Sequence, residues 1–306
     1  MNNELKCPHC GSIDLQSNSK IRRPSKGKYK GKLINNFRCK NCGHYPSLVI
    51  QEENTSDKKV KSYLFMGCLH LPFQNRYLMD GILKLMDANK YDGVIFAGDF
   101  LDMGALGQYE KGKINHTGVT LKEEYDEGNI LLDEFDKRLS KDALKVFLWG
   151  NHCDRYWRWL ADVNNSKLGA VMNPTDELKL IERGYIVKDK YKEDFYKLGS
   201  LYCMHGEYYN IHSAKKHLDE FKRNTIYVHT HRSQMHREGD FCAWNTGFMG
   251  NINAPCFSYA GRGMKGKWAN GFAIIHIDEN NNHYVDQINC IDDKFVCNGV
   301  IYGKDN

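Results

Sequence analysis

The chain has 306 residues, of which 41% are hydrophobic and 26% are charged. These proportions are typical of a folded globular protein and exclude a largely disordered one. No run of about 18 apolar residues exists, so no membrane-spanning helix is expected. The first six residues contain no apolar segment of a secretory signal, and we expect a cytoplasmic protein. Its eleven cysteines therefore predict metal ligands and reduced thiols, not disulfides.

The net charge of +5 is unevenly distributed along the chain. Residues 1–50 hold ten Lys and Arg side chains against two acidic ones, a net charge of +8. The remaining residues hold 33 basic and 36 acidic side chains, a net charge of −3. A basic N-terminal segment favours nucleic acid as a partner, and the alternative is a solvent-exposed basic loop. The side chains expected to contact nucleic acid are Arg22, Arg23, Lys26, Lys28, Lys30 and Lys32.

Two Cys-x-x-Cys pairs lie in this basic segment, and a glycine follows each pair. The pairs are Cys7 with Cys10 and Cys39 with Cys42. Four thiolates with this spacing can bind one structural zinc ion tetrahedrally. Few apolar side chains are present to build a core, so we expect the zinc to replace one. Residues 5–50 of this N-terminal domain, residues 1–50, resemble a zinc ribbon, a module found in nucleic-acid proteins that can also bind proteins. His9 and His44 are not expected to be ligands.

The polar residues 51–59 predict a linker, and residues 60–306 a second domain. In this domain short apolar runs alternate with amphipathic stretches. Strands are expected at 63–66, 93–97, 143–149, 201–204, 225–229, 241–245, 272–277 and 283–290. Helices are expected at 75–89, 121–139 and 212–223. Such alternation is typical of an α/β domain with a largely parallel sheet.

Five polar clusters follow predicted strands, and each contains a potential metal ligand. They are Gly67-Cys68-Leu69-His70, Gly98-Asp99-Phe100-Leu101-Asp102, Gly150-Asn151-His152, His205-Gly206 and His229-Thr230-His231. Loops at the carboxyl ends of strands are where open α/β folds place their sites. A single cluster could be a structural loop, but five in this arrangement indicate a metal centre.

The order of the clusters resembles the calcineurin-like metallophosphoesterase family over about residues 62–250. The family pattern is Asp-x-His, Gly-Asp-x-x-Asp, Gly-Asn-His, a His followed by Gly, and Gly-His-x-His. The resemblance implies a four-layer α/β/β/α sandwich of mixed sheets with a small N-terminal zinc-ribbon domain before it. It also implies a catalytic site with two divalent ions, Mn, Zn or Fe, that activate water to attack a phosphate ester.

The resemblance also implies a role for each cluster residue. Asp99 would bridge the two metals, because a carboxylate can offer one oxygen to each ion. The other ligands would be His70 and His231 for the first metal, and Asn151, His205 and His229 for the second. His152 would protonate the leaving oxygen, and Asp102 would orient it. Arg155 would either hold a phosphate oxygen or serve only in a helix.

Two positions depart from the family pattern. Val228 replaces a glycine, which leaves both histidines of the last cluster in place. Cys68 stands where the family has Asp. Its thiolate could be a soft ligand to the first metal, favouring zinc or iron over magnesium or manganese. The alternative is a small buried side chain next to a weak or empty first site.

Two further segments have alternative interpretations. Tyr208 and Tyr209 could form a stacking platform for bases, and packing is the alternative. Residues 261–267, with the sequence GRGMKGK, predict a flexible basic loop that contacts substrate phosphates or is only solvated.

Three functions agree with these observations. A phosphodiesterase or nuclease acting on nucleic acid agrees best, because of the basic module and the His-x-His ending. A phosphomonoesterase acting on nucleotide or protein is the second, although Met103 follows Asp102 where the protein-phosphatase branch has Arg. The third is a nucleic-acid-binding protein whose catalytic site is impaired at Cys68. The abundance of Asn, Lys and Tyr suggests an AT-rich genome, such as that of a phage in a bacterial host or of a low-GC bacterium.

Overall fold

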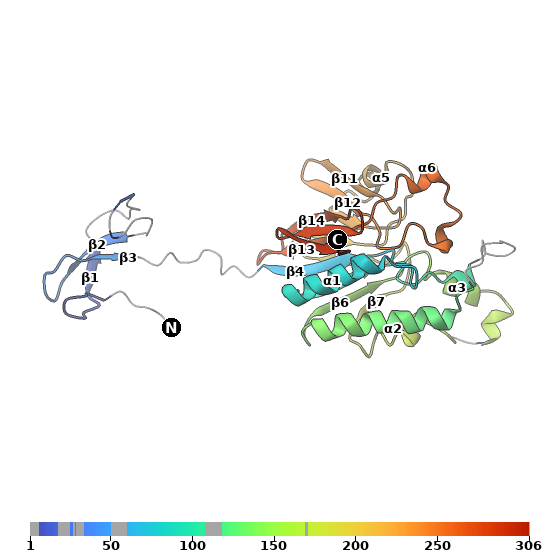
Figure 1. Cartoon of the computed structure of the whole chain (residues 1–306), viewed down its shortest axis with the longest axis horizontal. Helices are drawn as coiled ribbons and strands as arrows, with labels where there is room; N and C mark the ends of the chain where they lie inside the picture. Colours follow the sequence, from blue (N-terminus) through green and yellow to red (C-terminus); the bar gives the residue numbers. More distant parts are fainter. Residues whose placement is uncertain are drawn as a thin grey trace. The chain divides into compact units, whose positions relative to one another are not determined.

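A computed structural model describes residues 6–17, 25–26, 28, 34–49, 60–107, 118–168 and 171–305. The chain divides into two compact units, Met1–Lys59 and Val60–Asn306, and Figure 1 shows both. The segment 51–59, for which the sequence predicts a linker, lies outside the described residues. We describe each unit by itself.

The N-terminal unit contains a three-stranded antiparallel sheet in the order β1-β2-β3. The strands are β1 (Leu15–Ser17), β2 (Ile34–Cys39) and β3 (Ser47–Val49). Among its described hydrophobic side chains, those fully buried are Cys7, Ile34 and Cys39. Two of the three are cysteines, so apolar packing contributes little to the stability of this unit.

The first sheet of the C-terminal unit has six strands in the order β14-β13-β4-β5-β6-β7. Their bounds are β14 (His283–Asn289), β13 (Gly271–Ile277), β4 (Lys61–Met66), β5 (Gly93–Ala97), β6 (Leu144–Leu148) and β7 (Ile186–Lys188). Strands β4 to β7 are parallel, and β13 and β14 are antiparallel to their neighbours. The parallel strands have nearly continuous apolar runs because both faces of the sheet are covered.

The second sheet has five strands in the order β11-β12-β10-β9-β8. Their bounds are β11 (Ser233–Glu238), β12 (Phe241–Thr246), β10 (Thr225–Tyr227), β9 (Leu201–Cys203) and β8 (Tyr196–Leu198). The three central strands are parallel and the two outer ones antiparallel. A hairpin of β15 (Lys294–Cys297) and β16 (Val300–Gly303) packs on the first helix of the unit.

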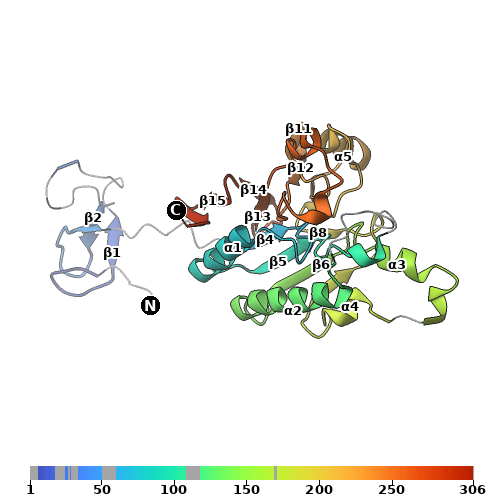
Figure 2. The ribbon, with the colours of Figure 1, turned by 45° about the vertical axis from the view of Figure 1, so that its right-hand side comes forward.

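Helices cover the outer face of each sheet (Figures 1 and 2). Helices α1 (Arg76–Ala88) and α2 (Leu121–Arg138) lie on the first sheet, and α5 (Ser213–Phe221) lies on the second. The Asn75 side chain caps the start of α1, and Thr120 with Glu123 forms a capping box at the start of α2. The short helices are α3 (Arg155–Leu160), α4 (Pro174–Glu177) and α6 (Arg262–Lys265).

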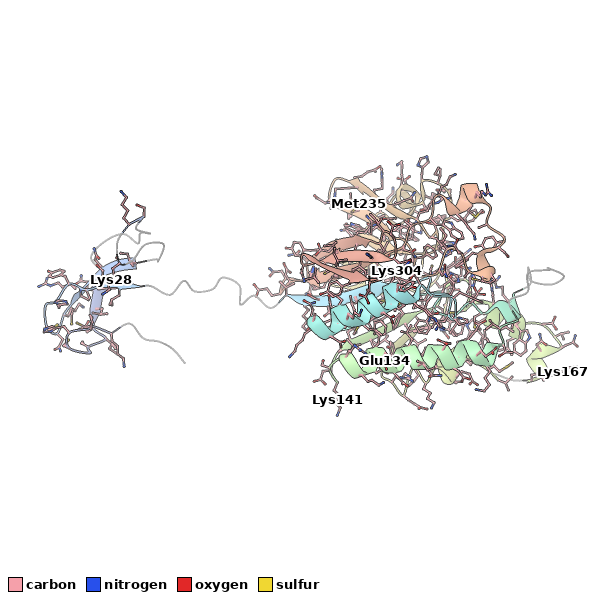
Figure 3. The ribbon with its side chains drawn as sticks, in the orientation of Figure 1. Lys28, Glu134, Lys141, Lys167, Met235 and Lys304 are labelled. Carbon is pink, nitrogen blue, oxygen red and sulfur yellow. The ribbon has the colours of Figure 1, made fainter. Side chains whose placement is uncertain are left out.

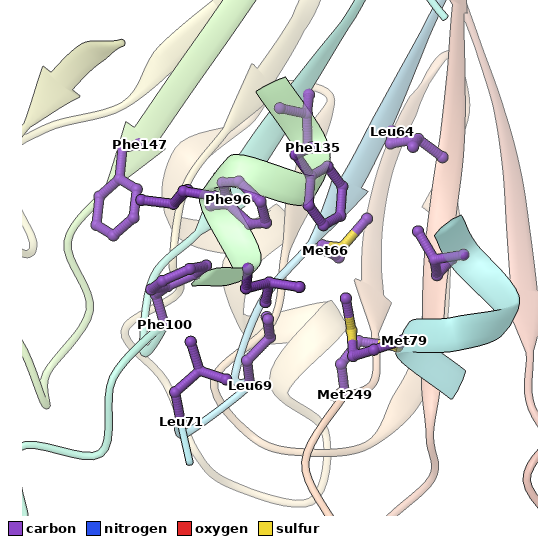
Figure 4. Close-up of a cluster of buried hydrophobic side chains, with 14 of the residues drawn as sticks. Leu64, Met66, Leu69, Leu71, Met79, Phe96, Phe100, Phe135, Phe147 and Met249 are labelled. Carbon is purple, nitrogen blue, oxygen red and sulfur yellow. The ribbon is translucent and has the colours of Figure 1, made fainter. Parts of the chain in front are cut away.

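Three apolar layers separate the helices and sheets. Successive side chains of β4 point to opposite faces, so Leu64 and Met66 pack toward α1 and α2, whereas Tyr63 and Phe65 pack between the sheets. Figure 4 shows the first of these layers, where Phe135 of α2 packs against Phe96. A third cluster joins α5 to the second sheet. Charged side chains such as Lys141 and Lys167 point outward (Figure 3).

The four-layer α/β/β/α architecture predicted from the sequence is confirmed. The predicted strands and helices of this unit all form, with ends that differ by at most two residues. The strands and helices without a sequence prediction include β7, β8, β11, β15, β16 and α4, which are short or lack a regular apolar pattern. The prediction of a loop at 261–267 is wrong in part, because Arg262–Lys265 form α6. No helix among the described residues is long and apolar enough to span a membrane.

Candidate metal centre

The five polar clusters come together at one edge of the two sheets. They follow β4, β5 and β6 of the first sheet and β9 and β10 of the second. Because the strands that carry them run parallel within each sheet, their carboxyl ends lie side by side. The facing sheets therefore bring ligands from segments more than a hundred residues apart into contact.

The backbone at this edge is strained. Cys68, His70, Asp99, His229 and His231 all adopt φ angles between +47° and +71°. Left-handed backbone costs a residue other than glycine on the order of 1–3 kcal/mol, and such positions concentrate at functional sites. The hydrogen bonds Cys68 N–H to Gly98 O and His70 N–H to Asp99 O, 2.9 and 3.0 Å, hold the first two loops together in this conformation.

One group of potential ligands consists of Cys68, His70 and His231, whose side-chain donor atoms lie within 4.8 Å of one another. His70 Nδ1 is 3.2 Å from the Asp102 carboxylate, which leaves the Nε2 lone pair of His70 facing His231 Nε2 at 3.2 Å. The His231 ring stacks on Phe248 with centroids 4.5 Å apart. All three ligands are buried.

A second group surrounds His205. Its Nδ1–H donates to the carbonyl oxygen of Ala97 at 2.8 Å, so its Nε2 carries a lone pair. That Nε2 lies 3.0 Å from Asn151 Oδ1 and 3.3 Å from Asp99 Oδ2. His229 Nδ1 approaches the same Asn151 oxygen at 2.9 Å. With His205 neutral, the lone pairs of His205 Nε2, Asn151 Oδ1 and Asp99 Oδ2 face one another, so the donor set fits a divalent metal.

Asp99 and Cys68 connect the two groups. An Asp99 carboxylate oxygen lies within 4.8 Å of donor atoms of Cys68 and His205. Donor atoms of His70 and His152 lie within the same distance of Asp99. Cys68 Sγ accepts a hydrogen bond from the His229 N–H at 3.3 Å. Gly150 permits the approach of Asp99, because a Cβ at position 150 would stand 2.2 Å from Asp99 Oδ1.

The electrostatics of the site also favour bound cations. Burial alone would raise the pKa of Asp99, but His205 and His152 hold that pKa well below its usual range. Burial and the neighbouring His205 lower the pKa of His229 to about 3, which keeps its imidazole neutral. Burial and the Asp99 carboxylate raise the pKa of the Cys68 thiol well above its usual value. A thiolate at position 68 therefore requires a metal ion beside it.

The residues predicted for acid catalysis lie next to the ligands. His152 Nδ1 is 2.6 Å from the Asp102 carbonyl oxygen and 3.4 Å from its carboxylate. Burial would raise the pKa of Asp102, but its hydrogen bonds to His152 and His70 lower that pKa well below the usual range. Arg155 donates from Nη1 to the carbonyl oxygens of Asp102 and Met103, and its Nη2 lies 3.2 Å from His152 Nε2. Asp102 thus contacts both His70 and His152.

The cavity beside these residues has a volume of about 270 Å³. The sequence analysis did not identify several of the side chains that line it. Arg232, Tyr259 and Trp268 line it, and the Trp268 ring lies 4.6 Å from that of His231. The position of Arg232 directly after His231 is the one signal that could have identified it. The two tyrosines considered as a stacking platform lie in different surroundings. Tyr209 lines this cavity, whereas Tyr208 packs against His217.

The four cysteines of the N-terminal unit also come together, with all Sγ atoms within 4.8 Å of one another. Gly11 and Gly43 adopt left-handed φ angles of +73° and +71°, as expected for the turns after each pair. The backbone N–H of Cys42 lowers the pKa of Cys39 to about 6. These features fit a small zinc-binding region.

Of the predicted nucleic-acid contacts, Lys26 and Lys28 are exposed. Those outside the described residues are Arg22, Arg23, Lys30 and Lys32.

Comparison with known proteins identifies the class. The model of the calcineurin-like phosphoesterase family matches residues 61–246, which include all five clusters. The chain belongs to this family, and the resemblance seen in the sequence is confirmed. It is accordingly a metal-dependent phosphoesterase, a hydrolase that acts on phosphate esters.

Solved structures resemble the chain only distantly. Vacuolar Protein Sorting 29 from Cryptosporidium parvum is 15% identical with a TM-score of 0.39, over 79% of this chain and 94% of that one. Wild-type Vps29 complexed with Zn²⁺ from Entamoeba histolytica is 12% identical with a TM-score of 0.40, over 79% and 97%. A putative 5'-nucleotidase from Staphylococcus aureus is 12% identical with a TM-score of 0.38, over 75% and 53%. No curated protein matches the chain.

Proposed function

We propose that this protein is a phosphodiesterase that hydrolyses nucleic acid at a site for two divalent metal ions. Asp99 would join the two ions, with Cys68, His70 and His231 on one side and Asn151, His205 and His229 on the other. Bound there, the ions would polarise the phosphoryl group and lower the pKa of the attacking water. The observation that carries the proposal is the convergence of buried potential metal ligands around Asp99 and His205.

His152 supplies the proton in this proposal. A carbonyl oxygen can only accept, so the 2.6 Å contact with Asp102 O places a proton on His152 Nδ1. His152 Nε2 is then the atom that takes up and releases a proton at the leaving oxygen. Asp102 holds the ring by its carbonyl oxygen and stabilises its positive charge with its carboxylate. Arg155 is held 3.2 Å from His152 Nε2, where its guanidinium can also bind a phosphate oxygen.

Nucleic acid is the substrate that the charge of the chain supports. Residues 1–50 have a net charge of +8, and we propose that their four cysteines hold one zinc ion and that the module binds DNA or RNA. Residues 51–59 would then be the linker that joins this module to the catalytic domain, residues 60–306. The position after Asp102 is Met103, so the Arg of the protein-phosphatase branch is lacking there.

Hydrolysis of bis-p-nitrophenyl phosphate tests this function. Metal-stripped protein would receive manganese, zinc, iron(II) or magnesium in turn. We expect turnover that falls on the order of a hundredfold or more in His152→Ala, while the matched variant His212→Ala, at an exposed position, keeps it. Faster turnover of p-nitrophenyl phosphate than of the diester would instead indicate a phosphomonoesterase. Turnover of neither ester with any metal would overturn the proposal.

A further inference from the structure

Large exposed side chains line the catalytic cavity together with the potential metal ligands. Tyr209, Tyr259 and Met264 line the cavity and are 80%, 57% and 46% exposed. Trp268 also lines the cavity, with its ring 6.4 Å from that of Tyr259. Exposed aromatic faces beside a catalytic site are available for a ligand with flat rings.

Tyr209 is exposed although its loop is firmly anchored. Arg232 Nη1 donates to the Asn210 carbonyl oxygen at 3.0 Å, and Gln234 Nε2 donates to the Ile211 carbonyl oxygen at 2.7 Å. Arg232 and Gln234 lie one and three residues after His231. Their hydrogen bonds therefore connect the loop that carries Tyr209 to a potential metal ligand. The loop therefore presents the Tyr209 ring at a defined place on the cavity wall.

Tyr259 is likewise connected to the metal ligands through packed rings. Trp268 touches both Tyr259 and His231, and Phe257 packs against Trp268 and His70. A ring stacked on Tyr259 would therefore lie at a set distance from the ion held by the first ligand group.

Cationic side chains accompany these aromatic rings. Arg232 lines the cavity, and its Nε is buried with no hydrogen-bond partner among the described residues. Helix α6 and the residues after it bring Arg262, Lys265 and Lys267 to the segment that carries Met264 and Trp268. A phosphate in the cavity would be attracted by the Arg232 guanidinium and by these other cations.

We propose that the cavity binds an unpaired stretch of polynucleotide, with bases stacked on Tyr209 and Tyr259 and a backbone phosphate on Arg232. This inference rests on the proposed phosphodiesterase function and specifies its substrate as single-stranded nucleic acid. In a duplex the faces of the bases are already stacked on one another, so they are not available to tyrosine rings. Alternating aromatic and cationic side chains are typical of sites for single strands.

Cleavage of matched oligonucleotides tests the proposal. An end-labelled single strand, the same strand annealed to its complement, and bis-p-nitrophenyl phosphate would be compared with the metal-loaded full chain. We expect the single strand to be cut faster than the duplex. In Tyr209→Ala and Tyr259→Ala the ratio of kcat/KM on the single strand to kcat/KM on bis-p-nitrophenyl phosphate should fall by about tenfold or more.

Two controls separate stacking from structural damage. Tyr209→Phe keeps the ring and should restore the ratio to near that of the unmodified chain. Tyr284→Ala removes an exposed tyrosine of β14 that does not line the cavity, and should leave the ratio unaltered.

The possible failures are distinguishable. Equal cleavage of single strand and duplex, or an unaltered ratio in both alanine variants, overturns the inference while turnover of the small diester still supports the phosphodiesterase. Absence of turnover on every diester overturns the proposed function, and the inference with it.

Discussion

Cys68 is the residue at which this chain departs most from its family. Its sulfur lies within 4.8 Å of donor atoms of His70 and His231, and also within 4.8 Å of donor atoms of Asp99 and His205, and the side chain is fully buried. A thiolate is softer than the carboxylate that it replaces, and soft ligands prefer zinc or iron(II) to manganese or magnesium. The position of the sulfur supports the ligand interpretation over that of a merely small buried side chain.

Replacing this sulfur should change the choice of metal. In Cys68→Asp we expect the preference to move from zinc or iron(II) toward manganese and magnesium, because a hard carboxylate replaces a soft thiolate. Metal content after equilibration with mixed ions, together with turnover for each ion, measures the effect. Cys290→Ser is the matched control, since this thiol lies outside both groups. Identical metal preferences in the unmodified chain and Cys68→Asp would contradict the assignment.

At the scale of elements, helix α2 holds the loop that follows Asp102 in place. Glu124, on its first turn, is buried and accepts hydrogen bonds from the N–H groups of Met103 and Gly104 at 2.6 and 3.3 Å. These two residues directly follow Asp102. Burial and the neighbouring Asp102 raise the pKa of Glu124 to about 8. The helix thus fixes the loop that holds His152 and Arg155.

This carboxyl should make stability fall as the pH rises. Its pKa is higher in the folded chain than in the unfolded one, so its contribution is largest below about pH 4.5 and is lost by about pH 8. Between pH 6 and 9 we expect the free energy of unfolding to decrease by on the order of 2 kcal/mol from this group. Glu124→Gln should flatten that decrease, measured by denaturant unfolding at several pH values.

Glu127→Gln, on the same helix, is the control for this experiment, because Glu127 pairs with Arg76. It should keep the pH dependence of the unmodified chain. If Glu124→Gln loses stability between pH 6 and 9 as steeply as Glu127→Gln does, the assignment of the pH dependence to Glu124 is wrong.

At the scale of the whole molecule, the two units obtain their stability from different sources. The C-terminal unit has three buried apolar clusters, whereas the N-terminal unit has four converging thiols and few buried apolar side chains among its described residues. We therefore expect the N-terminal unit to depend on its metal, and the C-terminal unit to stay folded when that metal is lost.

Removal of one thiol separates the two units experimentally. All five tryptophans lie between positions 149 and 268, so tryptophan fluorescence reports on the C-terminal unit alone. Cys39→Ser should lose zinc, expose residues 1–59 to trypsin and weaken nucleic-acid binding, with the thermal midpoint by fluorescence unchanged. His9→Ala, beside a ligand, should keep the zinc. A lower fluorescence midpoint in Cys39→Ser would show that the units are not independent.

Most elements and the positions of the potential metal ligands could be predicted from local sequence. Each polar cluster directly follows an apolar run, and a run buried on both faces predicts a strand whatever its neighbours are. The caps of α1 and α2 also lie within a few residues of the helix ends. These features are local, since the side chains that produce them are near one another along the chain.

The arrangement around the ligands was decided by tertiary structure. Asp102 joins His70 to His152, Glu124 reaches the loop after β5 from a helix, and Arg232 anchors the loop of Tyr209. The hydrophobic periodicity and motif spacing of the sequence do not predict these contacts, because each contact joins residues from separate elements. The sequence predicted which residues could bind metal. The packing of two sheets against each other decided which of their atoms meet and which aromatic rings remain exposed beside them.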